Sequence, residues 1–217
     1  MPASTRRALG AVAAALGIVF VVVGAWVVVM LGPSGSAQFS ATSKAPGAIE
    51  VPADVLNAVD VPMHVTVTRG DGGAVLLAVA PSADARAILA TSAVSTVSAV
   101  HYPAGSLDLR ASGTGALPDL ARADIWRLTA RGAGSAELLV DQGRAPETLV
   151  VTSGDSTALK DVTVTLTWAD HAWFFEALAM GTLGAVLAAF AFTDLWQGRV
   201  TTDPVVAGQA QTRRARA

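Results

Sequence analysis

The chain has 217 residues, a formal net charge of −2 and no cysteine. The lack of cysteine excludes disulfide bonds, thiolate metal sites and thiol nucleophiles. Hydrophobic residues make up 52% of the chain, which predicts membrane-spanning segments beside one domain of modest size.

The first such segment is residues 8–31, which contain no charged, amide or hydroxyl side chain. Its 24 residues exceed the roughly 20 that an α-helix needs to cross the hydrocarbon core of a bilayer. We therefore predict a transmembrane helix at 8–31. A cleaved signal peptide is the alternative, because Gly35-Ser36-Ala37 offers small residues to a peptidase, although an apolar region of about 7 to 15 residues is usual there.

Residues 32–50 are rich in Gly, Ser, Ala and Pro and show no hydrophobic period. We expect them to form a linker. After them, 63–69 and 74–80 have the patterns of two strands, and the glycine-rich turn 70–73 joins them. The sequence therefore predicts a β-hairpin here, followed by a short helix with Ser82 as its N-cap.

The rest of the region 51–170 repeats short apolar or alternating segments separated by Gly- and Asp-rich turns. This spacing predicts an all-β, β-sandwich-like domain with one short helix. Trp126 would be its core tryptophan, because Leu128 and Ala130 share its face. Further strands are expected at 93–101, 107–111, 124–130, 136–140, 148–152 and 161–168.

Several of these segments carry a resemblance. Asp124-Ile-Trp126, Gly132-Ala-Gly134, Glu137-Leu-Leu139 and Thr148-Leu-Val-Val-Thr-Ser-Gly-Asp155-Ser resemble the exported domain of uncharacterised actinobacterial membrane proteins. In that group a tryptophan, a Gly-x-Gly turn and a valine-rich hairpin precede the last membrane span. The resemblance extends over roughly 61–192. It implies a topology, an extracytoplasmic β-rich domain between two transmembrane helices, and brings no known activity with it.

A second transmembrane helix is predicted at 172–196. Its uncharged part, 177–193, is short for a span. Tryptophans flank it at both ends, however, and an arginine-rich tail follows, as is typical of membrane interfaces and cytoplasmic flanks. Both tails, 1–7 and 197–217, are therefore expected in the cytoplasm of a two-pass protein of the cell membrane.

The region between the spans is acidic. Fourteen Asp and Glu residues and nine Lys and Arg residues lie between Pro33 and His171, a net charge of −5. Nucleic acid is therefore not an expected partner, because its phosphates attract basic surfaces.

Small residues follow one face of each predicted span. Glycines recur at seven-residue spacing in the first span, the repeat of left-handed helix packing, and a second small-residue strip lies in the other. Two interpretations remain open: the spans pack on each other, or the small-residue faces bind another membrane protein. The candidate packing residues are Gly10, Gly17, Gly24, Gly181, Gly184 and Ala188.

Residues that could carry chemistry are few. The histidines, at 64, 101 and 171, show no metal-binding spacing. No Gly-x-Ser-x-Gly elbow or phosphate-binding loop occurs. Asp60 and His64 are close enough in sequence to pair, and Glu176 lies inside the second predicted span, where an acid is costly.

We therefore expect no catalytic, cofactor or metal site. The expected partner is the lipid bilayer, with another membrane protein as a second candidate. The predicted role is that of an accessory or scaffold subunit; a receptor-like outer domain that binds a small molecule or an envelope component is the alternative.

Overall fold

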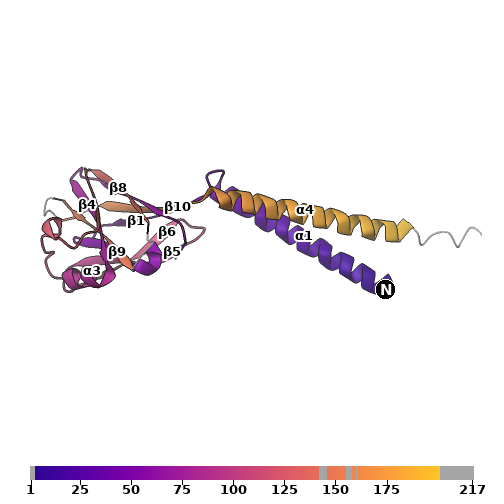
Figure 1. The fold of residues 1–217 in the computed structure, drawn as a ribbon, viewed down its shortest axis with the longest axis horizontal. Helices are drawn as coiled ribbons and strands as arrows, with labels where there is room; N and C mark the ends of the chain where they lie inside the picture. The colour runs from indigo at the N-terminus through magenta and orange to yellow at the C-terminus, as the bar shows by residue number, and fades with distance from the viewer. Residues whose placement is uncertain (1–2, 142–145, 155–157, 160, 201–217) are drawn as a thin grey trace, which may run out of the picture. The chain divides into compact units, whose positions relative to one another are not determined.

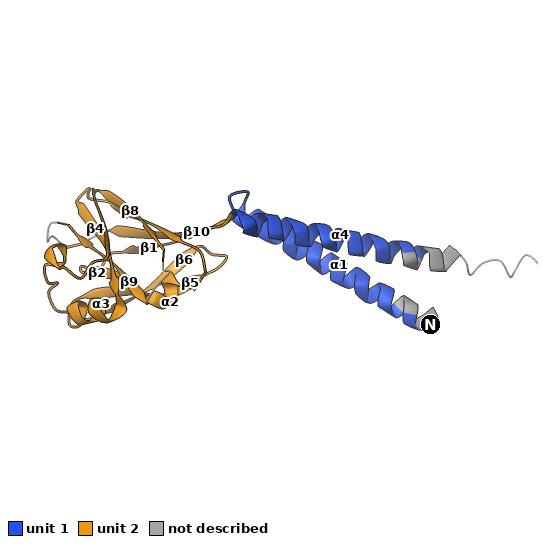
Figure 2. Ribbon diagram, viewed as in Figure 1, with its two compact units in different colours: residues 1–35, 171–217 blue, residues 36–170 orange. Residues whose placement is uncertain are grey.

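The computed structural model describes residues 3–141, 146–154, 158–159 and 161–200 (Figure 1). The chain divides into two compact units (Figure 2). One unit holds the helices α1 (Ala3–Leu31) and α4 (His171–Val200), called the helix pair below. The other, residues 36–170, is called the β domain.

Both helices of the pair contain a segment that is long and apolar enough to cross a membrane. These segments are Ala8–Leu31, of 24 residues, and His171–Thr193, of 23 residues. The prediction of two long apolar helices at the two ends of a β-rich domain is confirmed. In α4 the helix includes Glu176, whose side chain is exposed.

The β domain contains one sheet of ten strands in the order β7-β4-β9-β2-β5-β6-β1-β10-β3-β8. Its end strands, β7 and β8, contact each other beside the turn at Gly134, so the sheet curls nearly into a barrel. The all-β prediction is confirmed, whereas the two packed sheets of a sandwich are not. The strands are β1 (Ser36–Ser43), β2 (Ala48–Val51), β3 (Met63–Arg69), β4 (Ala74–Pro81), β5 (Val94–His101), β6 (Ser106–Ser112), β7 (Leu128–Ala133), β8 (Ser135–Val140), β9 (Glu147–Ser153) and β10 (Val162–Ala169).

The linker expected at residues 32–50 is wrong, because this segment contains β1 and most of β2. Strand β1 pairs with β10 along its whole length, from Ser36–Ala169 to Ser43–Val162. Small polar residues hide this strand from a local pattern, and Phe39 is its one large buried side chain. Long-range pairing therefore decides a conformation that the local composition does not.

The hairpin expected from β3 and β4 is also wrong. Strand β3 pairs with β10 and β8, and β4 pairs with β7 and β9. Arg69 stands at the point where the two strands part: its guanidinium binds Asp71 at 2.6 Å and donates to the carbonyl of Ala74 at 3.1 Å. A Cβ on Gly73 would lie 2.6 Å from the Arg69 guanidinium carbon, so a larger residue there would displace this guanidinium.

This contact gives a pH-dependent prediction. Hydrogen bonds from Arg69 and from the Gly73 N–H hold the pKa of Asp71 below its usual value. Stability from the charged carboxylate is therefore present above the unfolded pKa of about 3.9 and is lost as the pH falls through the folded value. We expect Asp71→Asn to lower the denaturant midpoint of the β domain at pH 7 and to differ less from wild type at pH 3.

Chemical unfolding of the full chain in detergent measures this difference. Asp124→Asn, at an exposed position, is the matched control and should leave the denaturant midpoint unchanged at pH 7 and at pH 3. An equal loss for Asp71→Asn at pH 7 and pH 3 would contradict the ionic role of Asp71.

Two further corrections concern the segment around β4 and β7. Helix α3 (Ser82–Leu89) has Pro81, not Ser82, at its N-cap; the Ser82 hydroxyl oxygen instead lies 2.9 Å from that of Thr148. Strand β7 begins only at Leu128, so Trp126 lies outside it. The indole of Trp126 donates to the carbonyl of Leu120 at 2.7 Å.

The tryptophan buried in the main core is Trp168 on β10, which is 2% exposed. It packs edge-on against Phe39, with ring centroids 5.6 Å apart. The predicted apolar face of β10 is confirmed, because Val162, Val164 and Leu166 are fully buried. Trp126 is partly buried and packs against a separate hydrophobic cluster that includes Leu120 and the α3 residues Ala85 and Leu89.

Candidate functional site

The first candidate site is the contact between the two helices. Gly17 and Gly24 are buried, and a Cβ on Gly17 would lie 2.7 Å from the backbone of Gly184 and Ala188. A Cβ on Gly24 would lie 2.8 Å from the backbone of Ala177 and Gly181. The two backbones therefore touch where the side chains are absent, as in close helix packing within lipid. These six residues, Gly17, Gly24, Ala177, Gly181, Gly184 and Ala188, are called the glycine seam.

The seam has the period of a left-handed helix crossing. On α4 the most buried positions are Ala177, Gly184 and Ala191, seven residues apart, as Gly17 and Gly24 are on α1. Gly17 faces Gly184 and Ala188, whereas Gly24, further along α1, faces the earlier residues Ala177 and Gly181 of α4. The two helices are therefore antiparallel. Gly10, the third glycine of the predicted face, is half-buried.

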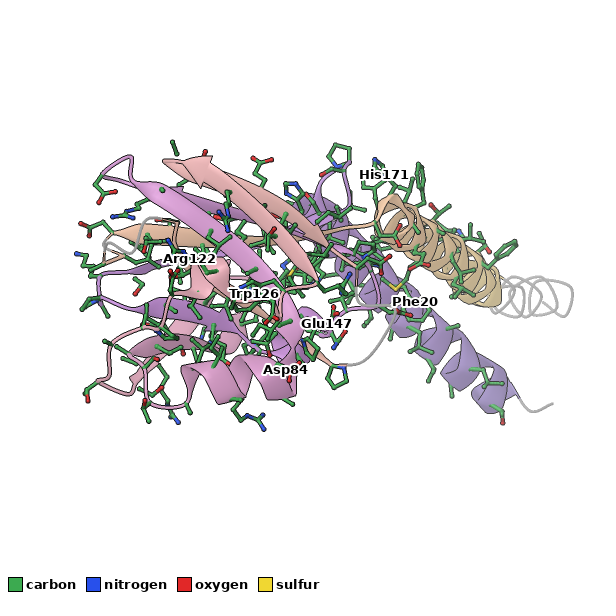
Figure 3. All side chains as sticks on the ribbon, turned by 60° about the vertical axis from the view of Figure 1, so that its left-hand side comes forward. Phe20, Asp84, Arg122, Trp126, Glu147 and His171 are labelled. Carbon is green, nitrogen blue, oxygen red and sulfur yellow. The ribbon has the colours of Figure 1, made fainter. Side chains whose placement is uncertain are left out.

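Outside the seam, the helix pair presents large apolar side chains. Phe20, labelled in Figure 3, contacts Gly184 across the seam, whereas most of its large neighbours point away from the partner helix. More than two fifths of the surface of each of these side chains is exposed: Leu9, Val12, Leu16, Ile18, Val19, Val22, Val29, Phe175, Phe190, Phe192 and Trp196. A surface of this kind is typical of contact with lipid or with another apolar surface.

The second candidate site is a cleft of about 620 Å³ in the β domain. One wall is the segment 114–121, which follows β6 and includes the first residues of the 3-10 helix Leu120–Arg122. The rest of the lining consists of Pro46, Gly47, Ala93, Thr152, Ser153 and Ala158. This cleft was not predicted from the sequence. Two sequence features could have indicated it: the Pro46-Gly47 pair, and the long stretch between β6 and β7 that lacks an alternating pattern.

The lining of this cleft is almost uncharged. Of the described residues that line it, only Asp119 carries a charge, and its carboxylate oxygen Oδ2 lies 3.3 Å from Nε of Arg122. Thr152 and Ser153 are 3% and 7% exposed. The arrangement suits an uncharged ligand that makes a few hydrogen bonds against apolar walls.

An ion pair with a buried carboxylate lies elsewhere in the β domain. Arg127 donates from Nε and Nη2 to the two carboxylate oxygens of Glu147, a bidentate geometry that favours strong pairing. The Glu147 side chain is 6% exposed and that of Arg127 is 39% exposed. Hydrogen bonding to Glu147 raises the pKa of Arg127. Figure 3 labels Glu147 together with Trp126, the neighbour of Arg127 in sequence.

The histidines do not form a shared site. Asp60 and His64, which are close enough in sequence to pair, do not do so among the described residues; Nε2 of His64 lies 3.9 Å from a carboxylate oxygen of Glu137 instead. His101 binds Asp108 at 2.8 Å on the exposed surface. Over residues 3–141, 146–154, 158–159 and 161–200, no group of three or more His, Asp or Glu side chains is placed to hold a metal ion.

Comparisons with known proteins add little to this geometry. No family model matches the chain, and no curated protein matches it. Among solved structures, the chain is similar to the D1-D2-D3 domains of the flagellar cap protein FliD from Escherichia coli, with 12% sequence identity and a TM-score of 0.26. That match covers 95% of this chain and 75% of the other. A likeness this weak carries no argument about function.

Proposed function

We propose that the chain is a two-pass membrane protein that holds its β domain outside the cytoplasm and acts as an accessory or scaffold subunit, without catalysing a reaction. The supporting observation is the helix pair. Its small residues pack against each other, and its large apolar side chains point outward. The relation to actinobacterial membrane proteins stays a prediction from the sequence.

The packing of the seam bears on how a partner would bind. Gly17, Gly24, Gly181 and Gly184 are occupied by contacts within the chain. This favours the interpretation in which the two spans pack on each other. A second membrane protein would then contact the outward apolar side chains or the β domain, not the seam.

The topology can be tested because the chain has no native cysteine. We expect the protein to stay in the membrane pellet after alkaline carbonate extraction. A single cysteine at Thr129, exposed on β7, should react with a membrane-impermeant maleimide in intact cells. A single cysteine at Thr5, exposed at the start of α1, should react only after permeabilisation.

Two results would overturn this proposal. Release of the chain by carbonate would remove the membrane anchor. Reaction of the Thr5 cysteine in intact cells, with protection of the Thr129 cysteine, would reverse the topology inferred from the arginine-rich tails.

The second candidate function is that of a receptor-like domain that binds a small molecule or an envelope component. The cleft of about 620 Å³ favours it, since this volume lies within the roughly 300–1,000 Å³ of typical ligand pockets.

A further inference from the structure

Strand β9 loses one of its two neighbours before it ends. Its pairing with β2 stops at Val151–Ile49, whereas its pairing with β4 continues to Ser153–Val75. Beyond this point the N–H of Gly154 donates to the carbonyl of Ala74 at 3.2 Å. Main-chain groups of successive residues point to opposite sides of a strand, so those of Ser153 point away from β4, to the side on which β2 has ended.

The residues before β2 explain why its pairing stops. Pro46 has no N–H to donate to a neighbouring strand. Gly47 has a φ of +134°, and a Cβ there would lie 2.2 Å from the carbonyl oxygen of Ala93. The N–H of Ala48 then donates to that same oxygen at 3.1 Å. The chain is thus drawn toward Ala93, and the position beside Ser153 becomes part of the cleft.

Two hydroxyl-bearing residues line the cleft at this place, with their side chains on opposite faces of β9. Thr152 and Ser153 are both more than nine-tenths buried and both line the cleft. Among the described residues, neither hydroxyl is a fully buried polar atom that lacks a hydrogen-bond partner, so each has a partner or reaches solvent. A ligand that hydrogen-bonds to the Thr152 hydroxyl would exchange a bond to water for this one, which gives a modest gain in affinity.

We propose that this cleft binds an uncharged, extended peptide segment that pairs with Ser153 where β2 has ended. One peptide residue offers both the acceptor and the donor that the N–H and C=O of Ser153 require, as in the addition of a strand to a sheet edge. The walls of Pro46, Leu117, Leu120 and Ala121 suit small apolar side chains. A charged ligand is disfavoured, because no cationic side chain lines the cleft in the described residues and Asp119 already has Arg122 as its partner.

This inference rests on the receptor-like alternative and names its ligand class; it does not depend on the membrane topology. If the peptide titration below fails and the thiol-labelling test gives the expected result, the peptide proposal is wrong and the membrane topology stands. If the titration succeeds and thiol labelling gives the opposite result, the topology is wrong and the peptide proposal stands.

The test is a titration of the full chain in lipid nanodiscs with acetyl-Ala-Val-Ala-amide, followed by NMR of ¹³C-labelled alanine methyl groups. We expect saturable shifts at Ala93, Ala121 and Ala158, which line the cleft, and none at Ala41 on β1. The same peptide with all three residues N-methylated lacks their N–H donors and should bind at least several-fold more weakly.

Three variants sharpen the test. Ala121→Trp, at a half-buried lining position, should fill the cleft and abolish the shifts. Thr152→Val, which keeps the shape and removes the hydroxyl, should weaken binding about 2- to 10-fold, and Thr129→Val on the exposed face of β7 should leave it unchanged. The proposal is overturned if no saturable shift occurs, if the N-methylated peptide binds equally well, or if Ala121→Trp binds as wild type does.

Discussion

Replacing both Gly17 and Gly24 with isoleucine is expected to separate the two helices of the pair. Each new Cβ would lie within 2.8 Å of the backbone of α4, and a backbone cannot turn aside as a flexible side chain does. Overpacking costs about 1–3 kcal/mol at a single site, so the double variant should lose several kcal/mol of helix association energy. In lipid no hydrophobic term offsets this loss, because association there depends on close packing.

The measurement uses energy transfer between two dyes during titration with SDS. The dyes are attached to cysteines introduced at Thr5 and Thr193, both exposed and both near the same end of the antiparallel pair. We expect the midpoint of the transition to fall sharply for Gly17→Ile/Gly24→Ile. Val22→Ile, on a side chain that is 61% exposed, is the control and should leave the midpoint unchanged. Equal midpoints for the two variants would refute the glycine seam.

The sequence carries a signal for the seam because the glycine spacing and the apolar run are both local. The seven-residue spacing of Gly17 and Gly24 is visible within one segment, and the length of its apolar run predicts a helix there. Two helices that each carry small residues along one face can approach most closely when these two faces contact each other. Two buried alanines of α4 were not predicted: Ala177, which is a seam residue, and Ala191, seven residues beyond Gly184.

The β domain is predicted less well because its contacts are distant in sequence. The alternation of Met63–Arg69 and of Val162–Ala169 identifies two strands correctly, yet alternation does not state a partner. Strand β1 pairs with a strand more than 100 residues away, and its Ser and Ala residues have little intrinsic preference for a strand. The cleft was missed for the same reason, since it forms only where Pro46-Gly47 diverts the chain beside a strand that is remote in sequence.

The second large effect is expected for Arg127→Met. This change leaves the carboxylate of Glu147, which is 6% exposed, without its bidentate partner. An unpaired buried charge is strongly destabilising. Because Arg127 itself is 39% exposed and water can enter the space that it vacates, we discount the usual penalty and expect a loss of about 2–3 kcal/mol in the free energy of unfolding.

The opposite change distinguishes this mechanism from a simple loss of contact. Glu147→Gln removes the charge, keeps the shape and leaves an amide oxygen to accept a hydrogen bond from Arg127, whose guanidinium can also reach solvent. We therefore expect Glu147→Gln to cost less than Arg127→Met. Equilibrium unfolding of the full chain in detergent compares the two variants.

Arg122→Met provides the matched control. Arg122 carries the same side chain as Arg127 and also pairs with a carboxylate, that of Asp119 at 3.3 Å, but its side chain is 88% exposed. Exposed ion pairs contribute about 0–1 kcal/mol, so this variant should stay near wild type. Losses of equal size for Arg122→Met and Arg127→Met would show that burial of Glu147 does not control the effect.

The pH dependence of the wild-type pair follows from the same contact. Hydrogen bonding to the Glu147 carboxylate raises the pKa of Arg127 above its already high usual range. A raised pKa on a basic group gives stability that is complete below the unfolded pKa and is lost only as the pH rises through the folded one. The difference between wild type and Arg127→Met should therefore stay constant between pH 7 and pH 10. A difference that shrinks over this interval would mean that a group other than the guanidinium of Arg127 titrates at this pair.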